Sequence, residues 1–361
     1  MRTGIIYHEA YLKHEQSPTH PERRERLAYT LDQLREEGIF EDPRIGIIPP
    51  REALLDEILL VHERGYIDLL KRMAVSGGSI DLDTRVSAGM YEQIVLAAGG
   101  ALTAAEKVFD CEVKNAFALI RPPGHHAKPG IGAGFCYLNN MAIMVKNVIE
   151  KDMAERVAIL DWDAHHGDGT QEIFYNDPNV LYISIHQDGR TLYPGSGFVD
   201  EIGLGRGEGY NICVPIPPGS SDDTYRLILN EIYIPVVEEF KPDLIAISAG
   251  QDNHFTDPLT SLALTAQGYA QMMREAVKLS EKLCGERLVT LLEGGYSVEG
   301  GLPYVNLGII AAMAGMSIDK IREPEVYKEV LNRRRRNVRG RVERTLDELR
   351  HILRDYWDCF R

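Results

Sequence analysis

Ionisable side chains crowd into one short stretch near the middle of the chain. The stretch follows the apolar run 157–160 (VAIL), whose residue types are typical of a buried strand. It contains Asp161, Asp163, His165, His166 and Asp168, and it closes with Gly169. Buried segments avoid ionisable groups unless a partner compensates their charge. A divalent cation held by carboxylate oxygen and imidazole nitrogen is the simplest compensation, so this stretch predicts a metal-dependent hydrolytic site.

The spacing of Asp163 and His165 suits one shared metal ion. The two residues are at i and i+2, so in an extended segment their side chains point to the same side. Asp252, at the end of a separate predicted strand, is the natural third ligand. Two carboxylates and one imidazole leave coordination positions open, as a catalytic site requires. Either residue alone would favour a helix cap for Asp163 and a core histidine for His165, but the joint pattern favours the metal.

A pair of histidines, His125 and His126, follows the rigid turn 122–124 (PPG). The prolines fix φ, and the glycine allows a close approach of the backbone. Adjacent imidazoles suggest a general base and an electrostatic partner, each of which needs an acceptor to set its tautomer. Asp161 and Asp168, the two carboxylates left over from the metal assignment, are the candidates.

Tyr296 follows Gly294 and Gly295, which form a flexible elbow that can direct a phenol into a cleft. A tyrosine hydroxyl there can donate a hydrogen bond to a developing oxyanion. The alternative is an ordinary tyrosine packed on the surface of a loop.

The elements that must position these groups alternate between strands and helices. The predicted strands are 3–7, 115–120, 156–161, 179–185, 211–216, 243–248 and 287–292. The predicted helices are 24–37, 52–74, 90–109, 138–150, 223–240 and 265–283. Alternation of this kind, with nearly continuous apolar strands, predicts an α/β fold whose parallel sheet is covered on both faces. Polar clusters follow five of these strands, so their loops are expected to converge on one pocket at the carboxyl edge of the sheet.

Composition limits the class of protein. The 361 residues are 44% hydrophobic, which suits a globular protein with a large core. A net charge of −14 argues against general nucleic-acid binding by the main domain. Five scattered cysteines without CxxC spacing favour a reducing, cytoplasmic setting with no thiolate metal site. We expect no signal peptide and no membrane span, because no apolar run is long enough.

The chain changes character after Gly315, and we expect residues 1–315 to form the catalytic domain and 316–361 a basic helical extension. Residues 333–336 are four consecutive arginines, for which a solvated face is favoured over a specific anion site. Apolar residues then recur at helical spacing, at Val338, Val342, Leu346, Leu349, Leu353 and Tyr356. This face is expected to pack on the main domain or on a second subunit, which would make a homo-oligomer.

Taken together, several stretches resemble the histone deacetylase superfamily, which includes acetylpolyamine amidohydrolases and acetoin-utilisation-type deacetylases. They are 20–27 (HPERRERL), 121–127 (RPPGHHA), 134–140 (GFCYLNN), 161–169 (DWDAHHGDG), 248–252 (SAGQD), 257–259 (DPL) and 293–296 (EGGY). The resemblance implies the three-layer α/β/α arginase/deacetylase fold, with a mostly parallel sheet and one catalytic zinc ion (Zn2+).

Residue by residue, the resemblance implies a complete active site. Asp163, His165 and Asp252 look like the zinc ligands. His126 looks like the general base and acid with His125 as its electrostatic partner, and Tyr296 looks like the carbonyl-polarising phenol. The implied substrate contacts are Phe135 and Tyr193 as channel walls next to Gly134, Leu259 and Asp83 at the rim, and Arg26 near an acetate-release cavity. Structural potassium (K+) is also implied, at one site around Asp161, Asp163, His165, Ser184 and Ile185 and at another around Phe174, Asp177, Val180 and Tyr210.

The implied reaction is hydrolysis of an acetamide on a primary amine, with acetyl-lysine or an acetylpolyamine as substrate. A two-manganese ureohydrolase on the same fold is a rival, but it needs a second DxD-type acidic cluster, and here Asp252 precedes Asn253 and His254. A catalytically silent acyl-lysine-binding protein is the rival from another class; the intact histidines and Tyr296 argue against it. For the extension alone, the arginine run leaves open a DNA or acidic partner.

Overall fold

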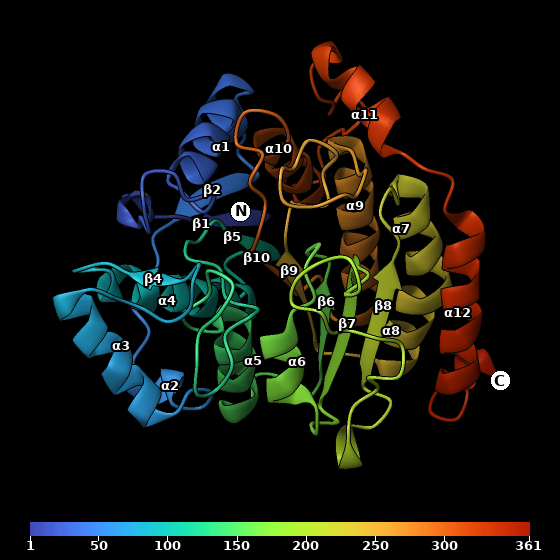
Figure 1. Ribbon diagram of the computed structural model, residues 1–361, viewed down its shortest axis with the longest axis horizontal. Coiled ribbons are helices and arrows are strands. Elements are labelled where there is room, and N and C mark those ends of the chain that lie inside the picture. The colour runs from blue at the N-terminus through green and yellow to red at the C-terminus, as the bar shows by residue number, and fades with distance from the viewer.

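The computed structural model describes residues 1–361 and is built around one eight-stranded parallel sheet (Figure 1). The order of the strands is β2-β1-β5-β10-β9-β6-β7-β8. Their bounds are β1 (Thr3–Ile6), β2 (Ile45–Ile48), β5 (Asn115–Ala118), β6 (Val157–Asp161), β7 (Val180–Gln187), β8 (Asn211–Ile216), β9 (Leu244–Ala249) and β10 (Leu288–Leu292). A separate antiparallel pair, β3 (Gly78–Ser79) and β4 (Arg85–Val86), lies in a loop near α3 (Arg64–Ser76).

The central strands are apolar along their whole length because both of their faces are covered. Every residue of β6 is buried, and Leu160 pairs in register with Ile183 of β7 and Ile247 of β9. A parallel sheet buried on both faces requires this continuous apolar pattern. β6 ends at Asp161, so the polar stretch 161–168 begins where the strand leaves the sheet.

Helices cover both faces of the sheet (Figure 1). α4 packs with α5 on one face, and α1, α10 and α9 pack together on the other. The bounds are α1 (Glu25–Glu36), α2 (Leu55–Ile58), α3 (Arg64–Ser76), α4 (Tyr91–Phe109), α5 (Asn140–Glu150), α6 (Asp168–Phe174), α7 (Asp222–Ile228), α8 (Ile234–Phe240), α9 (Ala266–Leu283), α10 (Leu302–Met313), α11 (Lys328–Arg334) and α12 (Arg339–Leu353). None of these helices combines the length and apolarity that a membrane crossing requires.

The C-terminal extension packs on the main body of the protein. α12 lies along α7 and β8, at the right of Figure 1. Its apolar residues Val342, Leu346, Leu349 and Leu353 are buried in the same hydrophobic core as the sheet. Tyr356, which was predicted on this face, is 38% exposed. Trp357 is buried instead, and its indole N–H donates to the carbonyl of Gly209 at 2.9 Å.

The predicted α/β architecture is confirmed, and the differences lie in short elements. All seven predicted strands are present, whereas β2 was not predicted. The segment 52–74 forms two helices, α2 and α3, and 223–240 contains a π-helical turn (Leu229–Tyr233) between α7 and α8. α6 and α10 were also not predicted. α6 has only seven residues, and α10 is buried on all sides and so lacks an amphipathic pattern.

Candidate active site

The two adjacent histidines are held by the two carboxylates that the sequence paired with them. Nδ1 of His125 lies 3.1 Å from Oδ2 of Asp161, and Nδ1 of His126 lies 2.8 Å from Oδ1 of Asp168. Both histidines are nearly buried, at 2% and 4% exposure. Each imidazole is therefore fixed through Nδ1. Nε2 of His126 is left free to act on another group, whereas Nε2 of His125 lies 3.9 Å from Oδ2 of Asp163.

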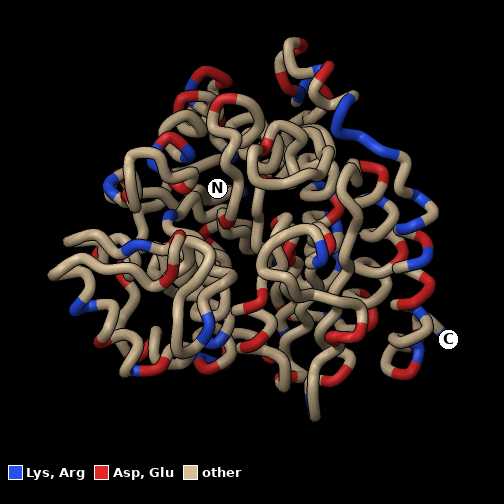
Figure 2. The backbone as a smooth tube through the Cα atoms, viewed as in Figure 1, with Lys and Arg blue, Asp and Glu red and all other residues tan.

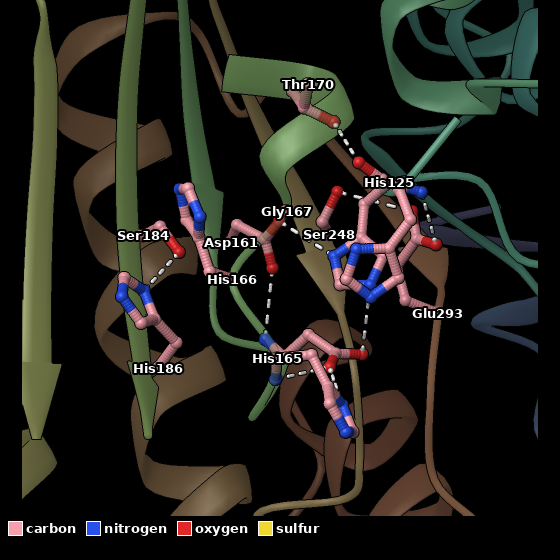
Figure 3. Close-up of polar contacts among 12 residues, drawn as sticks. His125, Asp161, His165, His166, Gly167, Thr170, Ser184, His186, Ser248 and Glu293 are labelled. Atoms are coloured by element: carbon pink, nitrogen blue, oxygen red, sulfur yellow. Dashed lines mark hydrogen bonds and ion pairs between the residues drawn. The ribbon is translucent and has the colours of Figure 1, made fainter. Parts of the chain in front are cut away.

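The carboxylate of Glu293 holds the backbone of this histidine loop, and this role was not predicted from the sequence. Its Oε2 accepts the backbone N–H groups of Gly124 at 2.7 Å and His125 at 3.2 Å, and Ser248 donates to its Oε1 at 3.3 Å. Figure 3 shows Glu293 beside the backbone of His125, while the imidazole is directed toward Asp161. Burial raises the pKa of Glu293 to about 7.

The electrostatic surroundings shift the pKa values of the two histidines in opposite directions. Burial lowers the pKa of His125, but the carboxylates of Asp163 and Asp161 outweigh burial and raise it well above its ordinary value. Burial and the neighbouring His125 lower the pKa of His126 to about 4, although Asp168 opposes this shift. The protein groups alone thus favour a cationic His125 beside a neutral His126, a pair of the kind that acid–base chemistry uses.

Asp163, His165 and Asp252 converge on one point. Ligand atoms of the three residues all lie within 4.8 Å of one another, and both carboxylates are fully buried. Nδ1 of His165 lies 3.1 Å from Oδ1 of Asp163 and 2.9 Å from Oδ2 of Asp252. Burial alone would lower the pKa of His165, but its contacts with these two carboxylates raise it to about 10.

This donor set fits a divalent cation. One imidazole nitrogen carries at most one proton, so the two carboxylates can at best share a single N–H at Nδ1 of His165. The second oxygen of each aspartate is already occupied, since Oδ2 of Asp163 accepts the N–H of Gly294 and Oδ1 of Asp252 accepts that of Ala164, both at 2.8 Å. A buried cation facing all three electron-pair donors satisfies them together.

The backbone of Tyr296 is held by a buried carboxylate. The backbone N–H of Tyr296 donates to Oδ2 of Asp257 at 2.7 Å, and the N–H of Leu259 donates to Oδ1 at 2.9 Å. The ring of Tyr296 contacts Arg26 and Phe135 and not a hydrogen-bond acceptor, and burial raises the pKa of the phenol well above its ordinary value. Tyr296 is therefore a protonated phenol with a free donor. Asp257 belongs to the motif 257–259 (DPL), but no role was predicted for it from the sequence.

A cavity of about 280 Å³ gives access to these groups. It is lined by Asp81, Asp83, His126, Gly134, Phe135, His165, Leu192, Tyr193, Leu259 and Tyr296. The cavity thus contains every predicted substrate contact except Arg26, together with Asp81 and Leu192, which were not predicted. Both of these lie within two residues of a predicted contact, which is the only sequence signal that marks them.

The walls of the cavity are aromatic and rigid. The ring of Phe135 lies edge-on to Tyr296, with centroids 5.7 Å apart, and Tyr193 lies edge-on to His126 at 5.1 Å. Phe135 adopts a left-handed conformation with φ of 69°, and its N–H donates to Oγ1 of Thr84 at 3.0 Å. A non-glycine residue held in this region is strained, and such strain gathers at ligand-binding sites.

Arg26 lies behind the cavity rather than in its wall. Its guanidinium packs 5.0 Å from the ring centroid of Tyr296 and donates to the carbonyls of Gly295, at 2.6 Å, and Glu293. Glu22 pairs with it at 3.0 Å in a site with no exposure. Arg26 therefore fixes the loop that carries Tyr296.

His166, which was left without a role, points away from the metal cluster. Its two ring nitrogens lie 2.9 Å from Oγ of Ser196 and 3.0 Å from Oε1 of Gln171. Figure 3 shows it on the side of β6 that faces His186. Glu201 and Cys213 lie close enough to form a second metal-like group with it, but these hydrogen bonds already account for the histidine.

A parallel α/β sheet with carboxylates and imidazoles gathered around a narrow cavity at its edge is the architecture of the arginase/deacetylase class. Residues 20–306 match the family model described as histone deacetylase domain. A probable deacetylase of Archaeoglobus fulgidus is 60% identical over 362 residues and covers 100% of both chains. A histone deacetylase-like amidohydrolase of Pseudomonas aeruginosa is 36% identical over 322 residues, which is 89% of this chain and 82% of that one.

A solved structure agrees with these relatives. The crystal structure of the HDA15 HD domain has a TM-score of 0.87 and 32% identity, and the match covers 99% of this chain and 96% of that one. The chain belongs to the histone deacetylase superfamily, a family of deacetylase hydrolases.

Proposed function

We propose that this protein is a zinc-dependent deacetylase that hydrolyses the acetamide of acetyl-lysine or a similar acetylated primary amine. The observation that carries the proposal is that His126, His165 and the free phenol of Tyr296 line one narrow cavity with aromatic walls. Asp163, His165 and Asp252 would hold the cation. When bound, the cation supplies a Lewis acid that polarises the acetyl carbonyl and lowers the pKa of the attacking water.

Tyr296, His126 and His125 carry out the other parts of the proposed reaction. The hydroxyl of Tyr296 donates a hydrogen bond to the acetyl oxygen, and this bond strengthens as negative charge develops there. Nε2 of His126 accepts the proton of the attacking water and returns it to the leaving amine. Asp168 keeps the proton of the neutral ring on Nδ1, so that Nε2 remains the acceptor. His125 acts as the electrostatic partner in this scheme, held by Asp161.

The shape of the cavity supports a linear substrate. Phe135 and Tyr193 offer aromatic faces to a methylene stem, and Leu259, 38% exposed, lies at the entrance. Asp83 lines the cavity and would accept hydrogen bonds from substrate backbone amides. An acetyl-lysine residue within a peptide meets each of these demands.

An acetylpolyamine is the second candidate substrate. Asp81 and Asp83 both line the cavity, and two carboxylates there would attract the ammonium groups of a polyamine. Competition kinetics between an acetyl-lysine peptide and a monoacetylated diamine of the same stem length decide between them. We expect the higher kcat/KM for the acetyl-lysine peptide. A higher kcat/KM for the acetylated diamine would instead identify an acetylpolyamine as the substrate.

The two rival functions have less support. A two-manganese ureohydrolase would need ligands for a second metal after Asp252. Here the amide of Asn253 donates to the carbonyl of Trp162, and Nε2 of His254 pairs with Glu323 at 2.7 Å. Metal analysis of the purified protein tests this: we expect one zinc ion per chain, and two ions would favour the binuclear site. A silent acyl-lysine-binding protein would bind the peptide and release no acetate.

Structural potassium remains part of the proposal, with Ser184 and Asp177 among its expected neighbours.

A further inference from the structure

The four consecutive arginines of the extension lie beside the candidate active site. They form the end of α11 and the start of the linker to α12, the continuous blue segment of Figure 2. Arg333, Arg334 and Arg336 face the segment 258–261 across a cleft of about 390 Å³, which we call the arginine cleft. Its other lining residues are Pro218, Pro258, Thr260 and Ser261.

The arginine cleft and the active-site cavity are lined by consecutive residues of one loop. Leu259 lines the active-site cavity, while its two chain neighbours, Pro258 and Thr260, line the arginine cleft. Neighbouring Cα atoms are about 3.8 Å apart, so the two openings lie on either side of the same short loop. A ligand held in the active-site cavity therefore lies next to these cations.

The backbone of the arginine run is fixed. The guanidinium of Arg334 donates to the carbonyl of Asp257 at 2.9 Å and to that of Thr260. The backbone N–H of Arg336 donates to the carbonyl of Gly219 at 3.1 Å. Because Arg334 is turned inward and anchored, Arg333 and Arg336 on either side of it are held at the cleft, and binding there requires little further ordering.

The charges of the outer arginines are largely uncompensated. Arg336 is exposed and makes no ion pair with a carboxylate. Arg333 pairs only with Glu329 at 3.2 Å, with both side chains about four-fifths exposed (78% and 84%), and pairs of this kind contribute little. Ser261, also in the cleft, is exposed. Guanidinium groups in this state favour bidentate pairing with a carboxylate.

We propose that the arginine cleft binds an acidic side chain of a peptide substrate, within a few residues of the acetyl-lysine held in the active-site cavity. The inference rests on the proposed deacetylase function and narrows its substrate to acetylated protein segments that carry Asp or Glu near the modified lysine. A polyamine stem would be repelled by these cations. A nucleic acid would also meet the rest of a chain whose overall net charge is −14, whereas a short acidic segment meets only the cleft.

Steady-state kinetics on paired peptides test the proposal. Each pair consists of two acetyl-lysine peptides that differ only by Glu or Gln at one position, from four residues before to four residues after the acetyl-lysine. For the best position, the wild-type protein should have a kcat/KM about fivefold to tenfold higher for the Glu peptide at low ionic strength. The difference should arise in KM and should fall toward unity at about 0.5 M salt.

Two double variants with the same loss of charge separate the cleft from general electrostatics. R333Q/R336Q should abolish the preference for Glu and leave kcat for the Gln peptide within about twofold. R341Q/R344Q removes two exposed arginines of α12 that line neither opening, and it should keep the preference. The preference should also persist in Arg344→Ala.

Four results would overturn the proposal. They are an equal kcat/KM for both peptides at every position, a preference that survives R333Q/R336Q, an equal loss on both peptides in that variant, and inhibition by duplex DNA that depends on the same two arginines. If the protein hydrolyses the Glu and Gln peptides equally well, only the proposal for the arginine cleft is wrong, and the proposed deacetylase function stands. Absence of hydrolysis of either peptide by the zinc-loaded protein would remove the proposed function as well.

Discussion

The buried carboxylate of Asp257 holds the backbone of Tyr296, with 2.7 Å between Oδ2 of the aspartate and the tyrosine nitrogen. Asp257 also accepts the N–H of Leu259 and is fully buried, and burial and the charge of Asp252 raise its pKa to about 8. One side chain thus fixes both the phenol and a residue of the cavity wall.

Replacing Asp257 should therefore damage rate more than metal binding. In Asp257→Ala the amide of Tyr296 loses its acceptor, and a displacement of the phenol by about 1 Å costs on the order of a hundredfold in kcat. The zinc content, measured by elemental analysis, should stay at the wild-type value. Asp223→Ala, which removes an exposed carboxylate of α7, is the control and should leave kcat unchanged. A loss of zinc in Asp257→Ala would contradict this role.

The carboxylates around β6 should separate into two classes when each is replaced by its amide. Asp163→Asn should lower zinc content, because its carboxylate belongs to the converging donor set. Asp168→Asn should keep the zinc and lower kcat by about tenfold to a hundredfold, because the amide no longer holds Nδ1 of His126 as a hydrogen-bond donor. Zinc analysis and kcat on the same preparations check both. Equal zinc loss in the two variants would mean that Asp168 is not merely an orienting group.

The extension should be required for stability. Leu349 of α12 is fully buried in the common core, so Leu349→Ala should lower the free energy of unfolding by about 3 kcal/mol. Glu348→Ala, on the exposed side of the same turn, should change it by less than about 0.5 kcal/mol. Denaturant titration provides the comparison. Near-identical midpoints for the two variants would show that the extension is not packed as described.

Acid should destabilise the protein through His62. Its Nε2 accepts the N–H of Asn139 at 2.9 Å, and its Nδ1 lies 3.3 Å from the carbonyl of Pro129, so the ring is held neutral. Burial lowers the pKa of His62 to about 4, whereas the unfolded chain has about 6.5. Between pH 4 and pH 6.5 the unfolded state binds more protons than the folded state. The stabilisation that comes from burying neutral His62 is therefore complete above pH 6.5 and is lost as pH falls toward 4. At pH 5 the loss is about 2 kcal/mol.

Unfolding titrations at pH 7 and pH 5 on wild type, His62→Gln and His351→Gln isolate this effect. The exposed His351 is the control and should leave the pH dependence unchanged. His62→Gln should lower stability at pH 7 and reduce the further loss at pH 5. A variant with the wild-type pH dependence would exclude His62 as the titrating group.

Local spacing was sufficient to predict the groups that follow a single strand. The i, i+2 relation of Asp163 and His165, and the pairing of the leftover Asp161 and Asp168 with the histidine loop, need only strand geometry and the compensation of buried charge. The structure brings these groups together at hydrogen-bonding distance.

Residues that act on distant backbone could not be predicted in this way. Glu293 and Asp257 hold N–H groups of other loops, and nothing in their own neighbourhoods identifies those partners. The place of the arginine run beside Leu259 likewise depends on how the extension packs. β2 escaped prediction because it has four residues and lies at the sheet edge, where Ile47 is 52% exposed.

Acetate release from an acetyl-lysine peptide by zinc-loaded protein tests the central proposal most directly. The wild-type protein should release one acetate per peptide consumed. His126→Ala and Tyr296→Phe should each lower kcat by at least about a hundredfold and keep their zinc, because the first removes the proton acceptor and the second the oxyanion donor. Full activity in either variant, or no acetate from the zinc-loaded wild type, would contradict the account.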